Sequence, residues 1–245
     1  MEEEKASDLV LIMKILTNVM SKDILIMAAS TDFEEQMAGS ASIAMKGLEL
    51  VMPLMSEELL RFPSLCTEYY RLILYVSEYF PESVSQLPQP MIGNLIRSIQ
   101  LALTTDYGND IMKFAMELLN VLGSYSCQDP NPQSALKGLK NVLANFSPAI
   151  FQVCLSTSAD VDVFSDGTLA LYSILACDRA PFDNYVENLL NSHTDECVKR
   201  KLGAAFDVLL PKDRDVTVLR RDKRDFRERF ETFLNDIQGL LFLNP

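Results

Sequence analysis

The chain has 245 residues, 48% of them hydrophobic and 23% charged, a composition typical of a globular protein with a sizeable core. Its 34 acidic side chains outnumber its 22 basic ones, and the resulting net charge of −12 argues against nucleic acid as a partner because phosphates would be repelled. With only nine glycines, the sequence disfavours folds that depend on many tight turns or on glycine-rich phosphate-binding loops.

Apolar residues recur at spacings of three and four along nearly the whole chain, beginning with Leu9, Met13, Leu16 and Met20. This spacing predicts helices, whereas the alternating stretches at 161–163 and 216–218 are too short to predict strands. We therefore expect an all-α protein with more than about 60% helix, well above the usual one third.

The periodicity and the positions of the prolines set the expected helix limits. The expected helices are Ser7–Ser21, Ser40–Leu54, Pro63–Phe80, Pro88–Thr104, Asn109–Ser126, Ser134–Ser156, Asp160–Cys177, Pro181–Ser192, Asp195–Leu210 and Arg221–Phe242. The helix from Ser134 should bend or break at Pro148, with the Ser147 hydroxyl as a cap.

Pairing these helices in order gives hairpins that start near Ser40, Pro88, Ser134 and Pro181, at spacings of 48, 46 and 47 residues. Helical hairpins of about 40–47 residues are typical of HEAT and armadillo repeats, which bury their apolar faces by stacking. We expect one α-solenoid domain, an armadillo-like superhelix over residues 1–245. It would comprise a leading helix and loop (1–37), about four hairpins (38–210), and a loop with a C-terminal capping helix (211–245).

The acidic surplus lies in the expected repeats. Residues 1–211 hold 14 basic and 27 acidic side chains, whereas residues 212–245 hold 8 and 7. The expected helix 221–242 begins with polar residues and ends with the apolar Ile237, Leu240, Leu241 and Phe242. A terminal helix that covers the last repeat is expected to have this pattern.

Motifs for catalysis are missing from the sequence. The single histidine, His193, is expected to be a solvated loop residue or a helix-end contact, and no phosphate-binding, dinucleotide-binding, nucleophile-elbow or zinc-protease pattern occurs. We therefore expect no enzyme activity, no catalytic residues, no cofactor and no metal.

The cysteine pattern and the N-terminus bear on the compartment. The five cysteines are odd in number and lack any Cys-x-x-Cys pair, which predicts neither a disulfide framework nor a zinc site. All five lie in or beside apolar stripes and are expected to be buried thiols: Cys66, Cys127, Cys154, Cys177 and Cys197. The acidic N-terminus is unlike a signal peptide and no long apolar run occurs, so we expect an intracellular protein with no membrane insertion.

One surface is a candidate for partner binding. On the 63–80 helix the expected core positions are Leu65, Tyr69, Leu72, Ile73, Val76 and Phe80. The candidate surface residues lie on this helix and on or just before the expected helix 109–126. They are Glu68, Arg71, Tyr75, Glu78, Asp106, Asp110 and Glu117. This face is either an ordinary solvated surface or an acidic inner groove for a basic cargo.

Five segments resemble a known family: Asp8–Asn18, Pro53–Tyr70, Tyr79–Glu82, Val186–Ser192 and Phe230–Leu241. They are similar to the C-terminal part of nuclear export receptors of the importin-β (karyopherin) superfamily. The similarity covers most of the chain and is weakest from Ser126 to Ala159.

The resemblance implies HEAT repeats whose second helices line a concave surface. Such receptors bind protein cargo together with Ran-GTP, contact nucleoporins and shuttle between nucleus and cytoplasm. Their main Ran contacts lie on N-terminal repeats, so this chain would be a C-terminal arch. Their cargo includes the hypusine-bearing translation factor, whose basic side chain would suit an acidic groove. A HEAT-repeat scaffold of another complex, such as a phosphatase or trafficking adaptor, would share the same composition.

Overall fold

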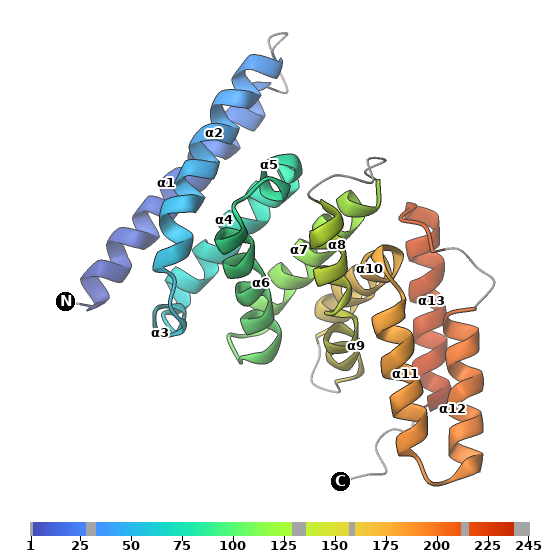
Figure 1. The fold of residues 1–245 in the computed structure, drawn as a ribbon. Helices are drawn as coiled ribbons and strands as arrows, with labels where there is room; N and C mark the ends of the chain where they lie inside the picture. The colour runs from blue at the N-terminus through green and yellow to red at the C-terminus, as the bar shows by residue number, and fades with distance from the viewer. Residues whose placement is uncertain (1, 28–32, 129–135, 157–159, 212–215, 238–245) are drawn as a thin grey trace. The chain divides into compact units, whose positions relative to one another are not determined.

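A computed structural model describes residues 2–27, 33–128, 136–156, 160–211 and 216–237 (Figure 1). Within these ranges 86% of the residues lie in α-helices and no strand occurs, which confirms the all-α prediction. The chain divides into two compact units, residues 1–122 and 123–245, and the boundary falls inside one helix. Each unit is described by itself.

The first unit contains the N-terminal helices. They are α1 (Glu2–Met27), α2 (Phe33–Val51), a 3-10 turn (Met52–Leu54), α3 (Glu57–Leu60), α4 (Pro63–Tyr79), α5 (Pro81–Ser85), α6 (Gln89–Thr104) and most of α7 (Asn109–Gln128). The short helices α3 and α5 were not expected from the sequence. Helix α4 packs against α1, α2, α3 and α5, so it lies at the centre of the unit.

The interior of this unit follows the predicted stripe of α4. Its six expected core residues, 65, 69, 72, 73, 76 and 80, are all buried. The Tyr70 hydroxyl donates to the Ser98 carbonyl of α6 at 2.7 Å, and the Tyr69 hydroxyl lies 2.8 Å from Ser98 Oγ. Because Ser98 Oγ itself donates to the Asn94 carbonyl, Tyr69 is the donor. Burial raises the pKa of Tyr69 to about 12, so this phenol keeps its proton at neutral pH.

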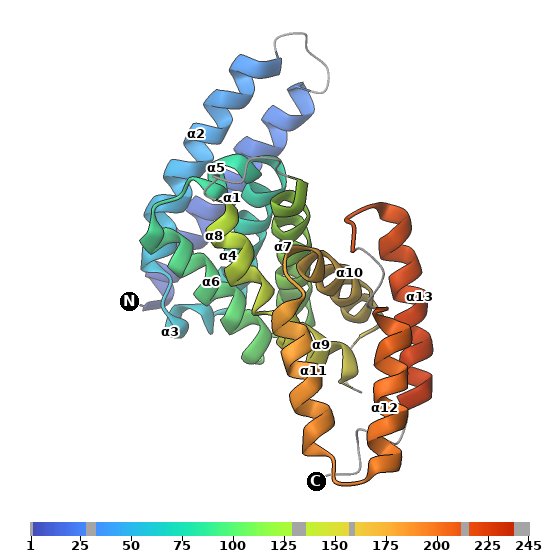
Figure 2. The same cartoon turned by 45° about the vertical axis from the view of Figure 1, so that its right-hand side comes forward.

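The second unit begins with the last turn of α7. It continues with α8 (Leu136–Ala144), α9 (Ser147–Leu155), α10 (Val161–Cys177), α11 (Ala180–Ser192), α12 (Glu196–Leu209) and α13 (Arg220–Ile237). Helix α10 packs against α8, α9 and α13, and α12 packs against α11 and α13. Figure 2 shows α12 and α13 side by side.

The start of α9 differs from expectation in its cap. The expected 134–156 helix is two helices, α8 and α9, and the break lies just before Pro148 as predicted. Ser147 does not cap α9; its hydroxyl donates instead to the Ala144 carbonyl at the end of α8, at 2.8 Å. Side-chain caps do form at Asp160 and Asp195, each of which accepts a backbone N–H two residues ahead.

The centre of the second unit is the ring of Phe151 on α9. This fully buried ring lies 5.3–6.0 Å, between centroids, from five aromatic rings on three other helices. These are Phe182, Tyr185, Phe206, Phe230 and Phe233. Edge-to-face and tilted pairs at this distance add to the free energy gained from burial alone. The Phe151 cluster therefore joins α9, α11, α12 and α13.

Helix α13 packs on the preceding helices of the second unit with its apolar face. Its apolar face, Phe226, Phe230, Phe233 and Ile237, is buried, and the helix packs against both α10 and α12. The Phe226 ring lies 4.9 Å from Tyr172 of α10. The part of the expected helix beyond Ile237 lies outside the described residues.

We predict that Phe151→Ala lowers the free energy of unfolding of the second unit by about 3–5 kcal/mol, because it removes a buried ring and leaves a cavity. Urea unfolding followed by circular dichroism measures this. The matched control Val208→Ala, at a 55% exposed position of the same unit, should change stability by about 0.5 kcal/mol or less. Equal effects of the two variants would contradict the role of the ring.

We also predict that a chain ending at Leu219 aggregates or melts at a lower temperature, because loss of α13 uncovers apolar surface on α10 and α12. Light scattering and thermal melting measure this outcome. The double variant Arg224→Ala and Glu228→Ala changes only exposed side chains of α13 and should behave like the natural sequence. A truncated chain that stays monomeric with unchanged melting would show that α13 is not a cover.

Candidate protein-binding groove

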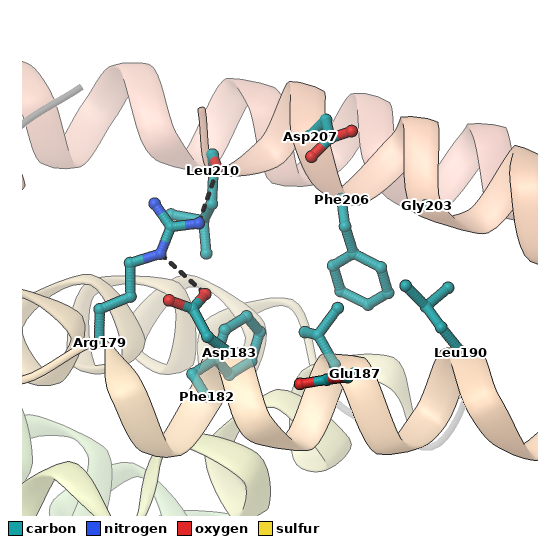
Figure 3. A pocket seen from close by; sticks show the side chains of 10 residues that line it. Arg179, Phe182, Asp183, Glu187, Leu190, Gly203, Phe206, Asp207 and Leu210 are labelled. Carbon is teal, nitrogen blue, oxygen red and sulfur yellow. Dashed lines mark hydrogen bonds and ion pairs between the residues drawn. The ribbon is translucent and has the colours of Figure 1, made fainter. Parts of the chain in front are cut away.

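A groove of about 740 Å³ lies between α11 and α12 (Figure 3). Helix α11 with its preceding residue contributes Arg179, Phe182, Asp183, Val186, Glu187 and Leu190, and helix α12 with its end contributes Gly203, Phe206, Asp207 and Leu210. The polar side chains of the lining are the carboxylates of Asp183, Glu187 and Asp207 and the guanidinium of Arg179.

The floor of the groove is apolar and rests on the Phe151 cluster. Phe182 and Phe206 are buried, and their rings are 6.4 Å apart. Val186 and Leu190 continue the α11 stripe at intervals of four residues and are half-buried, so they keep surface available to a ligand. Figure 3 shows Phe206 and Leu190 pointing toward one another from the two helices.

Gly203 keeps the groove open opposite Leu190. A Cβ placed at Gly203 would lie 3.9 Å from Leu190 Cδ1, which is ordinary van der Waals contact. Alanine would therefore fit without strain, and a larger side chain would occupy the groove itself.

Arg179 closes one end of the groove. Its guanidinium donates to the carbonyls of Leu210 at 2.9 Å and Pro211 at 3.1 Å, and its Nε lies 2.9 Å from Asp183 Oδ1. A cation at the end of α12 is favoured because the last carbonyls of a helix carry partial negative charge. Arg179 thus ties the start of α11 to the end of α12.

The rim of the groove is acidic. Asp183, Glu187 and Asp207 are exposed, against the single guanidinium of Arg179. Arg179 pairs with Asp183, which leaves the charges of Glu187 and Asp207 to face a ligand. An apolar floor with an acidic rim is complementary to a segment whose apolar side chains are flanked by basic ones.

The surface predicted from the sequence lies in the first unit and is only partly exposed. Glu68 is 7% exposed and its Oε1 accepts from Arg71 Nη1 at 2.8 Å, so the expectation that Glu68 faces solvent is wrong. The reason is that neighbours cover α4 on several sides, leaving little free face. Arg71 and Tyr75 are half-buried, and Glu78 is exposed.

The acidic part of that surface is more accessible. Asp106 and Asp110 are exposed on either side of the short turn between α6 and α7, and Glu117 is half-buried on α7. Of the seven predicted residues, the structure joins Glu68 to Arg71 in an ion pair, and Tyr75 stacks at 5.7 Å on Tyr79. The two carboxylates at the turn stay a candidate contact surface.

The cysteines and the histidine differ in part from expectation. All five cysteines are free thiols, and Cys66, Cys154 and Cys177 are buried as predicted. Cys197 is exposed in the first turn of α12, so its predicted burial is wrong, and Cys127 is half-buried. His193 is half-buried at the end of α11, where its backbone N–H donates to the Leu190 carbonyl, so of its two expected roles the structure shows the helix-end contact; its Nε2 is buried without a hydrogen-bond partner among the described residues.

Neither a membrane span nor a metal cluster is found in the part of the chain that the structure describes. No helix there is long and apolar enough to cross a membrane, and no three His, Cys, Asp or Glu side chains are grouped to hold a metal. No known protein-family model matches the chain.

The sequence did carry a signal for the groove. Phe182, Val186 and Leu190 form one stripe, and Gly203, Phe206 and Leu210 form another on the next helix. These stripes do not by themselves predict a groove, because periodicity alone does not tell a fully covered face from one that ends in an open groove.

We predict that Arg179→Ala lowers the free energy of unfolding by about 1–3 kcal/mol, because hydrogen bonds from a charged donor to two carbonyls are lost. Asp183→Asn, the matched control, should cost less than about 1 kcal/mol, since its ion pair is half exposed. Chemical denaturation measures both. A larger loss in Asp183→Asn than in Arg179→Ala would contradict the bridging role of the carbonyl contacts.

Proposed function

We propose that the chain is the C-terminal HEAT-repeat part of a nuclear export receptor similar to exportin-4, which binds protein cargo together with Ran-GTP and carries it through the nuclear pore. The observation that carries a binding function is the groove between α11 and α12, with its apolar floor and acidic rim. The five segments that resemble the karyopherin superfamily support the identity of the receptor.

A solenoid of HEAT hairpins is the proposed arrangement of the helices. In the second unit, Ser124 Oγ on α7 lies 3.2 Å from Ser173 Oγ on α10, and Cys127 Sγ lies 3.3 Å from Cys177 Sγ. Because both residue numbers rise together, the two helices run in the same direction where they meet. Their offset of 49–50 residues is close to the predicted period of 46–48, and second helices of successive repeats pack in this way.

The proposed occupant of the groove is an amphipathic segment of a protein partner, with an apolar face and basic flanks. Its apolar side chains would lie on Phe182, Val186 and Phe206, and its basic side chains would approach Glu187 and Asp207. The net charge of −12 would attract such a partner over a distance set by salt, with a screening length of roughly 8 Å at physiological ionic strength.

The other proposed partners follow from the resemblance. Ran-GTP would bind mainly through repeats that this chain does not contain, nucleoporins would be contacted during transit, and the hypusine-bearing translation factor is the proposed cargo. The receptor would shuttle between nucleus and cytoplasm.

The experiment uses the full-length receptor that contains this chain, purified hypusine-bearing factor, and Ran locked in its GTP form, with binding followed by calorimetry. We expect Ran-dependent binding that weakens as salt rises. Cargo binding that is absent with and without Ran, from a receptor that is folded, would contradict the export function and favour a scaffold of another complex.

Two pairs of variants test the groove. Gly203→Leu fills the groove, whereas its control Ala204→Leu places the same side chain at the exposed neighbouring position. We expect Gly203→Leu to weaken cargo binding about tenfold, equal to about 1.4 kcal/mol. Because leucine forms helices better than glycine, this loss would not result from a weakened α12. Unchanged affinity in Gly203→Leu would exclude the groove as the cargo site.

The second pair separates the groove from the acidic surface of the first unit. We expect reversal of Glu187 and Asp207 to lysine to weaken binding about tenfold at low salt and less at high salt. Reversal of Asp110 and Glu117 is the matched control with the same change in net charge. If that control weakens binding and the groove reversal does not, the cargo site is the surface predicted from the sequence.

A further inference from the structure

The last turn of α7 and the end of α10 approach each other unusually closely in the second unit. A Cβ at Gly123 would lie 3.1 Å from Ile174 Cδ1 and 3.2 Å from the Ser173 carbonyl carbon, which is tighter than most real contacts. Glycine at this position therefore allows the two helices to pack almost backbone to backbone.

This close packing brings two thiols together. Cys127 lies four residues after Gly123, and Cys177 lies four residues after Ser173, so each thiol extends from the same face as the close contact one turn earlier. The Cys127 and Cys177 Sγ atoms are 3.3 Å apart, and Cys177 Sγ lies 3.4 Å from the Gly123 carbonyl oxygen. A disulfide bond of about 2.05 Å needs a further approach of little more than 1 Å.

The charges around the pair favour a thiolate at Cys127. The hydrogen bond from Cys177 lowers the pKa of Cys127; burial opposes this shift, and the cations of Lys140 and Lys223 support it. The same hydrogen bond raises the pKa of Cys177, with burial and the nearby Asp178 acting in the same direction. Lys223 Nζ also donates to Ser124 Oγ at 2.7 Å, which places the cation of α13 beside the last turn of α7.

We propose that Cys127 and Cys177 are a redox pair that hydrogen peroxide converts to a disulfide and that a dithiol reduces again. Cys127 is the half-buried member and attacks first. Its thiolate sulfur displaces hydroxide from the peroxide O–O bond and becomes a sulfenic acid. The sulfur of Cys177 then attacks the Cys127 sulfur; the S–S bond forms, the S–O bond breaks, and one water leaves with the Cys177 proton. The two thiols lose two electrons and two protons, and the peroxide becomes two waters.

The bond would fix the end of α7 to the end of α10. It would close a chain loop that contains α8, nearly all of α10, and α9, the helix that carries Phe151. A closed loop of this length restricts the unfolded chain, so oxidation should stabilise the second unit. This proposal does not depend on the export function.

The test treats the full chain, carrying Cys197→Ser to remove the exposed thiol, with hydrogen peroxide. Alkylation after denaturation and peptide mass spectrometry then identify the products. We expect a linked pair of peptides containing Cys127 and Cys177, two hydrogens lighter than the separate peptides, while Cys66 and Cys154 stay alkylatable. Dithiothreitol should restore both thiols and lower the melting temperature of the oxidised chain to its initial value.

Two lysine variants and one serine variant test the electrostatic contribution. Lys223→Gln should slow disulfide formation several-fold, whereas Lys223→Arg keeps the cation and most of the rate. Ser124→Ala removes the hydrogen bond but no charge and should leave the rate near that of the parent. Circular dichroism checks that each variant is folded.

Other products would overturn the proposal. Sulfinic or sulfonic acid at Cys127 with Cys177 still a free thiol would show that the second thiol cannot resolve the first. Disulfides of Cys127 that form only between two chains would lead to the same conclusion. If all four remaining thiols were untouched in a chain whose methionines had been oxidised, Cys127 would not be a peroxide-reactive thiol and the proposal would be wrong.

Discussion

The burial of Phe151 is the interaction on which the second unit depends. One ring on the short helix α9 contacts rings from α11, α12 and α13 at 5.3–6.0 Å, so four helices share a single centre. Aromatic side chains suit this role because each buries a large area with few rotamers to fix. The position of α11 relative to α12, and with it the shape of the groove, follows from this cluster.

The groove combines a rigid floor with a charged rim. Phe182 and Phe206 belong both to the Phe151 cluster and to the groove lining, so the surface offered to a ligand is held by the core. Arg179 fixes one end by bonding the last carbonyls of α12, while Glu187 and Asp207 stay exposed. Because the apolar floor is already ordered before binding, less conformational entropy is lost when a partner binds. The charges of the rim raise the association rate and the selectivity for basic partners.

Features set by the local residue pattern could be predicted from the sequence. Features set by the packing of helices that are distant in the chain could not. The stripe of α4 and the break before Pro148 were predictable because helix period and proline chemistry act within a few residues. The burial of Glu68 was not, because it results from helices packed around α4 from elsewhere in the chain. The groove was not predictable for the same reason, because two apolar stripes look alike whether their helices close on each other or leave a gap. Gly203 adds to the gap only by lacking a side chain opposite Leu190.

The most direct test of the proposed cargo groove is methyl NMR of the proposed full-length receptor, with the methyl groups of Val186, Leu190 and Leu210 assigned, during titration with the proposed cargo, the hypusine-bearing factor, in the presence of Ran-GTP. We predict that the methyl signals of these three residues shift at low salt, that the shifts shrink as salt rises, and that the signals of the buried Leu74 in the first unit do not move. Saturable cargo binding that leaves all three signals unchanged would contradict the account.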